Sequence, residues 1–432
     1  MRADATLAGS KTVAAIGPRV AAEKTRQPWA MSRNAFGVAL VAEMSHPYWA
    51  AIVACLLLAG CTAARHPASP SPAAAPSFTC ARLADSPTAP FGIGIGDWNG
   101  DGTPDLAVSS SDTGRVSVYL NDGHGKFTSH GEVFSGQIAR HVAVGDMNGD
   151  GHLDLAVANG ESHDVAILLG DGSGGFRNVK QYRTGISPFD VALADLDGDG
   201  RLDLVIVNES NALIAGPHGI VSVLFGQPEG FAPPLKLNAG DHPSAVAVAE
   251  LNGTAGLDLA VTNWKSDTVS IFTNTGTRSF EHSGEIAYGG GRPYGVAAGD
   301  YNRDGFTDLA VTDLEHDAVV VMYGDGHGTF PRTASYKVGP GVRHVVSVDL
   351  DGDGVLDLVT ANTLSDSVSL LIGRPDGSFA PAQTMAVGLK PRTVMTRDLN
   401  GDGKPDIVVT DSGSDAVSLL FQTSGPSQAC PQ

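Results

Sequence analysis

An acidic nine-residue motif recurs seven times in this 432-residue chain at a nearly constant interval. The intervals between the first acidic residues of successive copies are 49, 49, 55, 50, 49 and 49 residues. Self-similarity at a fixed period of this size is the sequence signature of a repeat architecture, in which one supersecondary unit is copied along the chain. The first acidic residues of the seven copies are Asp97, Asp146, Asp195, Glu250, Asp300, Asp349 and Asp398.

Each unit has the pattern of four short strands. In the third copy, the apolar run 191–194 enters the acidic loop and the run 203–207 leaves it. A third run, 221–225, and a Gly-rich turn then lead to Phe231 and a fourth strand. The content of 54 Gly and 25 Pro, with only 6% aromatic residues, suits short strands and tight turns rather than long helices. These repeats predict an all-β fold, a seven-bladed β-propeller of four-stranded antiparallel blades.

The N-terminal part of the repeat region carries a piece that would close such a ring. A phenylalanine marks the fourth strand of six units, and the seventh unit lacks it. Phe78, however, lies 19 residues before Asp97, just as Phe176 lies 19 residues before Asp195. We therefore predict that the stretch from Phe78 to about Leu83 is the outer strand of blade seven, which would hide the sheet edges of an open ring. The fourth-strand phenylalanines are Phe127, Phe176, Phe231, Phe280, Phe330 and Phe379.

Within each loop, acidic or amide residues occupy positions 1, 3, 5 and 9. In the third copy these are Asp195, Asp197, Asp199 and Asp203, with Gly200 at position 6. Oxygen ligands at alternate positions point inward around one centre, and glycine permits the sharp turn. Such an oxygen-only site suits Ca²⁺ rather than Zn²⁺, which prefers nitrogen and sulfur ligands. The pattern departs from an EF-hand after position 9, because no glutamate follows at position 12 and a β run begins there.

The seven loops predict up to seven calcium sites, six of them well occupied. Blade four departs from the pattern, because Thr254 replaces the carboxylate of position 5 and the glycine is shifted to Gly256, so its site should be weak or empty. The alternative is that the loops are solvated acidic turns without metal. The predicted metal-binding residues are Asp97, Asn99, Asp101, Asp105, Asp146, Asn148, Asp150, Asp154, Asp195, Asp197, Asp199, Asp203, Glu250, Asn252, Asp258, Asp300, Asn302, Asp304, Asp308, Asp349, Asp351, Asp353, Asp357, Asp398, Asn400, Asp402 and Asp406.

These loops resemble those of FG-GAP-type (VCBS-like) repeats, the calcium-loop blades of the integrin α-subunit propeller and of several bacterial surface proteins and lectins. The resemblance covers roughly Phe78 to Gln422. The Phe-Gly and Gly-Ala-Pro pieces that name the family are mostly absent, with Phe91-Gly92 as the exception, so the resemblance is to the broader family rather than to integrins. It implies a calcium-binding propeller that acts as a binding module.

The first 77 residues are predicted to be an export signal followed by a tether. Residues 49–60 form an apolar run that is too short to span a bilayer and has the length of a signal-peptide core. The run ends in Leu-Ala-Gly-Cys, which resembles the lipobox of bacterial lipoproteins, in which the cysteine, here Cys61, is lipidated; the alternative is a chance match. Forty-eight residues precede the run, so Met31 is a plausible start. The predicted domains are therefore 1–60, a signal peptide with an over-extended start, 61–77, a lipidated Pro/Ala/Ser-rich tether, and 78–432, the propeller.

This organisation predicts an exported, membrane-anchored bacterial lipoprotein in the periplasm or on the cell surface. Disulfides persist in such a compartment. Cys80 lies in the predicted closing strand and Cys430 in the C-terminal tail, so we predict a Cys80–Cys430 disulfide; the alternative is two unpaired thiols.

The remaining patterns favour a non-enzymatic binding protein. The net charge of −19 argues against nucleic-acid binding, and 22 of the 47 acidic residues lie inside the seven loops. The chain has no HExxH or GxSxG motif, and its one GxGxxG match at 170–175 precedes no helix. We expect a monomeric binding or adhesion module for a protein or glycan. The alternatives are a scaffold or assembly lipoprotein that docks onto a membrane-bound partner, or the non-catalytic part of a polysaccharide-processing system.

Basic and aromatic residues in the connections between blades and in the second-to-third turns form the candidate ligand face, opposite the calcium loops. The connections include Phe91 and Phe189, and blade three has an insertion in its second-to-third turn. The alternative is that the arginines and histidines bridge neighbouring blades. The predicted ligand-binding residues are Arg140, His141, Trp264, Arg292, Tyr294, Arg343, His344 and Arg392.

Overall fold

A computed structural model describes residues 76–209, 219–289, 291–428 and residue 430. The predicted signal segment, the start at Met31, the lipidation site Cys61 and the tether up to residue 75 lie outside the described residues. Within them, no helix is long and apolar enough to cross a membrane.

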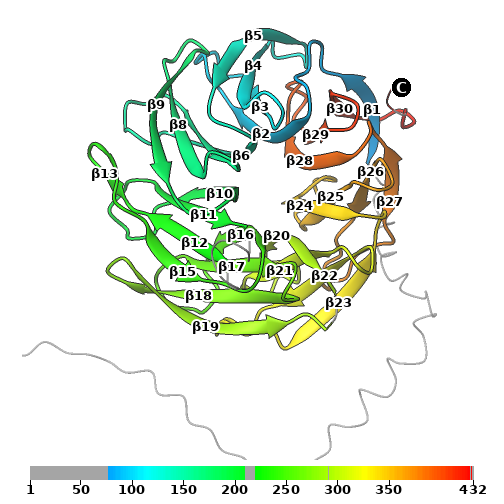
Figure 1. Cartoon of the computed structure of the whole chain (residues 1–432). Coiled ribbons are helices and arrows are strands. Elements are labelled where there is room, and N and C mark those ends of the chain that lie inside the picture. The colour runs from blue at the N-terminus through cyan, green and yellow to red at the C-terminus, as the bar shows by residue number, and fades with distance from the viewer. Residues whose placement is uncertain (1–75, 210–218, 290, 429, 431–432) are drawn as a thin grey trace, which may run out of the picture. The chain divides into compact units, whose positions relative to one another are not determined.

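The predicted propeller is confirmed: seven four-stranded antiparallel sheets surround a central axis (Figure 1). Blade one contains β2 (Pro90–Gly96), β3 (Asp105–Ser110), β4 (Arg115–Asn121) and β5 (Phe127–Phe134). Blade two contains β6 (Ala139–Gly145), β7 (Asp154–Asn159), β8 (Asp164–Gly170) and β9 (Phe176–Arg183). Blade three contains β10 (Pro188–Ala194), β11 (Asp203–Asn208), β12 (Ile220–Leu224) and β15 (Leu235–Asn238), with a small hairpin of β13 (Gly226–Gln227) and β14 (Gly230–Phe231).

The other four blades repeat this order from the axis outward. Blade four contains β16 (Pro243–Ala249), β17 (Asp258–Asn263), β18 (Thr268–Gly276) and β19 (Ser279–Ala287). Blade five contains β20 (Pro293–Gly299), β21 (Asp308–Asp313), β22 (Ala318–Tyr323) and β23 (Arg332–Lys337). Blade six contains β24 (Val342–Val348), β25 (Asp357–Asn362), β26 (Ser367–Leu371) and β27 (Gln383–Ala386). Blade seven contains β28 (Pro391–Arg397), β29 (Asp406–Asp411), β30 (Ala416–Thr423) and β1 (Ser77–Arg82).

The hydrophobic core consists of seven clusters, each shared by two neighbouring blades. The cluster between blades three and four, for example, combines Val205 and Val223 with Leu259 and Phe272. The second strand of every blade is buried along its whole length, because a blade packs against each of its faces. A blade therefore depends on its two neighbours for burial, as in other repeat proteins.

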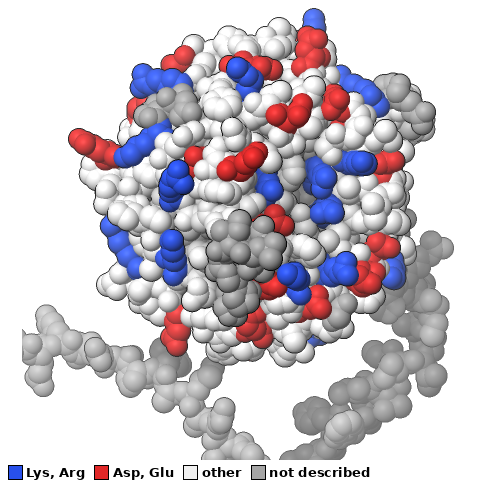
Figure 2. Space-filling model, viewed as in Figure 1, with Lys and Arg blue, Asp and Glu red and all other residues white. Residues whose placement is uncertain are grey.

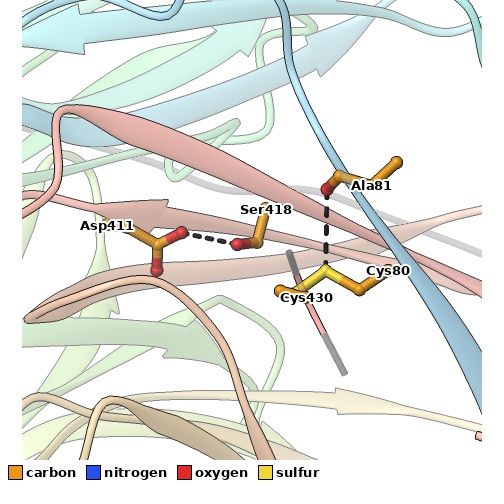
Figure 3. Close-up of a disulfide and its surroundings, with 5 residues drawn as sticks. All are labelled: Cys80, Ala81, Asp411, Ser418 and Cys430. Atoms are coloured by element: carbon orange, nitrogen blue, oxygen red, sulfur yellow. Dashed lines mark hydrogen bonds between the residues drawn. A yellow bond between two sulfur atoms is a disulfide. The ribbon is translucent and has the colours of Figure 1, made fainter. Parts of the chain in front are cut away.

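The ring closes within blade seven, as the sequence predicts. β1 pairs antiparallel with β30, and Phe78, which is fully buried, stands opposite Gln422. The C-terminal tail then runs along β1, where the Gln428 amide donates to the Phe78 carbonyl at 2.8 Å. The predicted disulfide between Cys80 and Cys430 is present, with a Cα–Cα distance of 4.6 Å (Figure 3). The disulfide indicates an extracytoplasmic location.

The phenylalanine that marks the end of each unit is less regular than expected. Phe127, Phe176 and Phe280 lie in fourth strands, whereas Phe330 and Phe379 precede theirs and Phe231 lies in the small hairpin of blade three. All six nevertheless pack into clusters between blades. The position is thus determined by packing between blades rather than by the hydrogen-bond ladder of the outer strand.

Candidate functional site

The first aspartate of each acidic loop organises the loop backbone. In blade one, Asp97 Oδ1 accepts hydrogen bonds from the amides of Gly100 at 2.7 Å and Asp101 at 3.1 Å, and Oδ2 accepts one from Gly102 at 2.8 Å. Both glycines have positive φ, 74° and 85°, which favours glycine at these two positions. The same three bonds recur at Asp146, Asp195 and Asp398.

The ninth-position aspartate joins the loop to the third strand, a role that the sequence analysis missed. Asp105 is fully buried; its Oδ2 accepts the Trp98 amide at 3.0 Å and its Oδ1 accepts the Asn121 amide at 2.8 Å. The equivalent pair of bonds occurs in all seven blades. Burial raises the pKa of these carboxyl groups, to about 6 for Asp308, Asp357 and Asp406. The sequence did mark this position as special, because position 9 is one of the few loop positions with the same residue, aspartate, in all seven copies.

The donor sets of these loops fit a hard cation. In blade three, carboxylate oxygens of Asp195, Asp197 and Asp203, at positions 1, 3 and 9, lie within 4.8 Å of one another. In blade six the corresponding group is formed by positions 1, 3 and 5, which are Asp349, Asp351 and Asp353. Carboxylate oxygen is the donor that Ca²⁺ and Mg²⁺ prefer.

An arginine of blade four contacts the acidic loop of blade three. Arg278, from the turn between β18 and β19 of blade four, contacts Asp197 Oδ2 with Nε at 2.5 Å and Asp199 Oδ2 with Nη2 at 3.1 Å. Arg201 forms a second ion pair with Asp199. The carboxylates at positions 3 and 5 of this loop are therefore neutralised by arginine side chains.

The loop of blade four has a different backbone. Glu250 Oε1 accepts the amides of Asn252, at 2.8 Å, and Gly253. The glycine at position 7, Gly256, has a φ of 136°, whereas the other loops have glycine at position 6. The departure seen in the sequence thus extends to the loop geometry.

A β-bulge near the start of each inner strand shapes the opposite end of the blades. In β2, for example, Pro90 pairs with Ser110 but Ile93 pairs with Val108, which leaves one extra residue on the inner strand. Bulges redirect side chains and are common beside binding sites. All seven blades have this irregularity. We call its first residues the bulge ring: Phe91, Arg140, Phe189, Ser244, Tyr294, Arg343 and Arg392.

The bulge ring lies at the far end of the inner strands from the acidic loops. Every inner strand runs from its bulge to its loop, as β2 runs from Pro90 to Gly96 just before Asp97. The loops and the bulge ring therefore occupy opposite ends of the central channel. Figure 2 shows Lys and Arg side chains around the middle of the face that it views.

Aromatic side chains of the bulge ring meet across the channel. The ring of Phe189 lies 5.6 Å from that of Phe91 and 5.8 Å from that of Tyr294, measured between centroids. His141 contacts Phe91, Phe189 and His344 at 5.4 to 5.6 Å. A cavity of about 440 Å³, lined in part by His141 and His344, occupies the channel.

Each arginine of the bulge ring stacks on an aromatic ring from a neighbouring blade. Arg140 lies 4.8 Å from the centroid of Phe189 and Arg343 lies 4.8 Å from that of Tyr294. Arg392 lies 5.8 Å from the centroid of Phe91, across the seam between blades seven and one. The arginines thus do connect neighbouring blades, through stacking as well as charge.

The charges of the bulge ring are only partly balanced. Arg140 pairs with Glu209 at 3.2 Å. Among the described residues, no carboxylate lies within ion-pair distance of Arg343 or Arg392. Burial, together with the guanidinium groups of Arg343 and Arg140, lowers the pKa of Arg392, which indicates that the three cations are crowded.

Below the arginines, His141 Nδ1 lies 3.1 Å from Asp190 Oδ1, and the Val246 amide donates to Asp190 Oδ2 at 3.1 Å. Burial acts to raise the pKa of Asp190, but its contact with His141 outweighs this and the pKa lies below its usual value. Burial lowers the pKa of His344 to about 3, so its ring is neutral. The carboxylate of Asp190 is therefore already engaged by the His141 ring and the Val246 amide.

The structure brings together six of the eight predicted ligand-binding residues, Arg140, His141, Tyr294, Arg343, His344 and Arg392. Trp264 lies elsewhere, against His242 in blade four at 5.3 Å. Arg292 is exposed and pairs with Glu315 at 3.4 Å. The sequence analysis missed Ser244, Asp190 and Glu209. Ser244 had a clear signal, because every bulge-ring residue stands six positions before the first acidic residue of its loop.

A family profile for FG-GAP-like repeats matches residues 97–157, 146–206, 250–311, 304–360 and 349–409, together more than half of the chain. The chain belongs to the FG-GAP-like repeat family. A search of curated proteins found no match to this FG-GAP-like protein.

Solved propellers share the fold of this FG-GAP-like protein at low sequence identity. One is BBS1N in a complex with ARL6DN, with 12% identity and a TM-score of 0.59 over 81% of this chain and 98% of that chain. Another is virginiamycin B lyase from Staphylococcus aureus, with 14% identity and a TM-score of 0.53 over 80% of this chain and 99% of that chain. At these identities the likeness shows the fold alone.

Proposed function

We propose that this protein is an extracytoplasmic binding module in which calcium stabilises the blades and the bulge ring binds the ligand. The observation that carries the proposal is the bulge ring itself, to which each of the seven blades contributes one residue. Convergent aromatic and arginine side chains are enriched in protein interaction sites.

The calcium part of the proposal rests on the loops. Their carboxylates and amides at positions 1, 3, 5 and 9 would hold the ion, which would supply the positive charge that neutralises them. Without it, carboxylates crowded into one turn repel one another. Binding that occurs only in the folded form adds about 2.7 kcal/mol per site when calcium exceeds its Kd a hundredfold.

Removal of calcium is therefore expected to lower Tm. Thermal unfolding followed during a titration with a calcium chelator measures the effect, and re-addition of Ca²⁺ should restore the original Tm, whereas Mg²⁺ serves as the comparison ion. A Tm that does not respond to the chelator would contradict the proposal that calcium stabilises the blades.

A protein ligand is favoured over a glycan. Sugar rings are bound by stacking on exposed aromatic faces, whereas Phe189, Tyr294 and Phe91 each carry a guanidinium group over one face. The polar groups of the bulge ring are mainly guanidinium groups, which donate hydrogen bonds to acceptor groups on a ligand. A scaffold that docks onto a membrane-bound partner is one form of this function, and it requires the anchor at Cys61. Mass spectrometry of the protein and of a Cys61→Ser variant tests for the acyl group.

The ligand face is tested with displayed peptides and a glycan array, both probed with the calcium-loaded protein. Binders of the native protein should be lost in the double variant Arg343→Gln/Arg392→Gln. They should be retained by Arg332→Gln, whose exposed arginine lies at the start of the outer strand β23, at the acidic-loop end of its blade, and stacks on Tyr323. Binders that do not distinguish these proteins would place the ligand face elsewhere.

A further inference from the structure

We propose that the bulge ring receives carboxylate side chains from an acidic segment of a protein partner. This inference rests on the proposed function and names the chemistry of its ligand.

The first argument is charge. The bulge ring contains three arginines, and among the described residues Glu209 is the only carboxylate paired with any of them. The nearby Asp190 is paired with His141. The bulge ring therefore carries a local excess of positive charge in a chain whose net charge is −19. Such a patch attracts an acidic segment, whereas the rest of the surface repels it.

The second argument is the way the guanidinium groups are held. Stacking of Arg140, Arg343 and Arg392 on aromatic rings restricts their motion and leaves N–H groups at the guanidinium edges. The planar fork of arginine matches a carboxylate through two parallel hydrogen bonds. Arginines fixed in this way lose less entropy on binding than free ones.

The backbone beneath the arginines is also fixed. Ser109 of blade one donates to the Arg140 carbonyl at 2.5 Å, and Thr410 of blade seven donates to the Phe91 carbonyl at 2.8 Å. Each hydroxyl belongs to the blade before the residue that it holds. The rim is thus built for a constant geometry, as a site that recognises one chemical group requires.

The third argument is space. The gap between the aromatic and arginine side chains at the mouth is only about 10 Å³, which is about the volume needed for one water. A ligand therefore binds on the rim and does not thread into the channel. This arrangement suits the short carboxylate side chains of a polypeptide that lies over the bulge ring better than a polymer that must enter the channel.

The test uses the full chain loaded with calcium and a fluorescein-labelled hexa-aspartate peptide, with hexa-asparagine as the neutral match. Fluorescence anisotropy should show binding of hexa-aspartate that weakens as salt is raised. Arg343→Gln/Arg392→Gln should weaken it at least about tenfold, because charge-assisted hydrogen bonds are lost. Arg332→Gln should leave it unchanged. Arg343→Lys/Arg392→Lys keeps the charge without the fork and should give an intermediate loss.

Tm and its response to calcium are measured for every variant. If the Gln variant unfolds, the Lys variant carries the comparison. Equal binding of hexa-aspartate by the native protein and by the Arg343/Arg392 variants would overturn the inference. Tighter binding of labelled tetragalacturonate than of hexa-aspartate would also overturn it. Ligands from the peptide display or the glycan array that require Arg343 and Arg392 but carry no acidic residues would overturn the inference and leave the proposed function standing. If no ligand requires these arginines, both are overturned.

Discussion

Asp411 ends the second strand of blade seven in a fully buried position (Figure 3). Burial raises the pKa of its carboxyl group to about 7, although Ser418 Oγ donates to Oδ2 at 2.6 Å and favours the charged form. At the same place four other blades carry an asparagine, which needs no charge to fit: Asn159, Asn208, Asn263 and Asn362.

Asp411→Asn is expected to stabilise the protein at pH 8 more than at pH 5. The folded pKa is raised, so the folded state keeps its proton while the unfolded state loses it, and native stability falls as pH rises from about 4 to about 7. Removing this titration should add on the order of 2–4 kcal/mol at pH 8. Tm measured for both proteins at both pH values checks it. The loop aspartates titrate in both proteins, so the difference between the proteins is the relevant quantity, and a difference independent of pH would contradict the assignment to Asp411.

At the scale of elements, hydroxyl groups of second strands hold the bulges of the next blade. Thr410 on β29 donates to the Phe91 carbonyl at 2.8 Å and accepts the Thr393 amide at 3.0 Å. Thr262 on β17 likewise donates to the Tyr294 carbonyl at 2.7 Å. These contacts join the bulge ring into one rim.

Thr410→Val should therefore destabilise the protein by about 1–3 kcal/mol, because the Phe91 carbonyl and the Thr393 amide lose their partner without a change of side-chain shape. Urea unfolding in calcium measures the change. Thr333→Val, at an exposed site on β23, is the control and should be near neutral. Equal effects of the two substitutions would show that the hydroxyl of Thr410 has no such role.

Arg278→Ala is expected to raise the calcium affinity of the blade-three loop. The turn that carries Arg278 places its guanidinium group on Asp197 and Asp199, where it competes with a bound cation. Terbium luminescence or calorimetry, in a protein in which the other loops remain intact, should show one site that tightens severalfold. Arg115→Ala, whose arginine starts β4 at the opposite end from the acidic loop and pairs with Glu132 at 3.9 Å, is the control. An unchanged or weakened site would mean that Arg278 supports the loop rather than competing for it.

The elements also show what sequence alone could predict. The number of blades and the loops follow from the spacing of the repeat, because each depends on local patterns copied seven times. The closing strand follows from the same spacing carried back to Phe78, and the disulfide follows from the place of Cys80 in that strand beside the C-terminal tail. The bulges do not, because a bulge depends on which residues pair across two strands. The paired Asp190 and Glu209 have no repeated equivalent, so no periodic signal marks them. The contact of Arg278 with the loop of blade three could not be predicted either, because 81 residues separate Arg278 from Asp197 in the sequence.

At the scale of the whole molecule, the disulfide fastens the seam of the ring. Cys80→Ser/Cys430→Ser is expected to lower stability by about 2–5 kcal/mol. Hydrogen exchange should increase first in β1 and β30, whose pairing carries the closure. Exchange that increases uniformly in all seven blades would show that the seam is not the weak point. Reduction of the native protein should reproduce the variant.

The closing strand also imposes an order on synthesis. β1 is made first, yet its partner β30 begins at Ala416, near the other end of the chain. Before Ala416 and the rest of β30 are made, Phe78 has no buried place, and any blades already formed are an open arc with an uncovered apolar blade face at each end. Contacts separated by almost the full length of a chain form slowly. A chain that is truncated before Ala416 therefore lacks the partner of β1, cannot close the ring and keeps exposed surfaces that can associate with other chains.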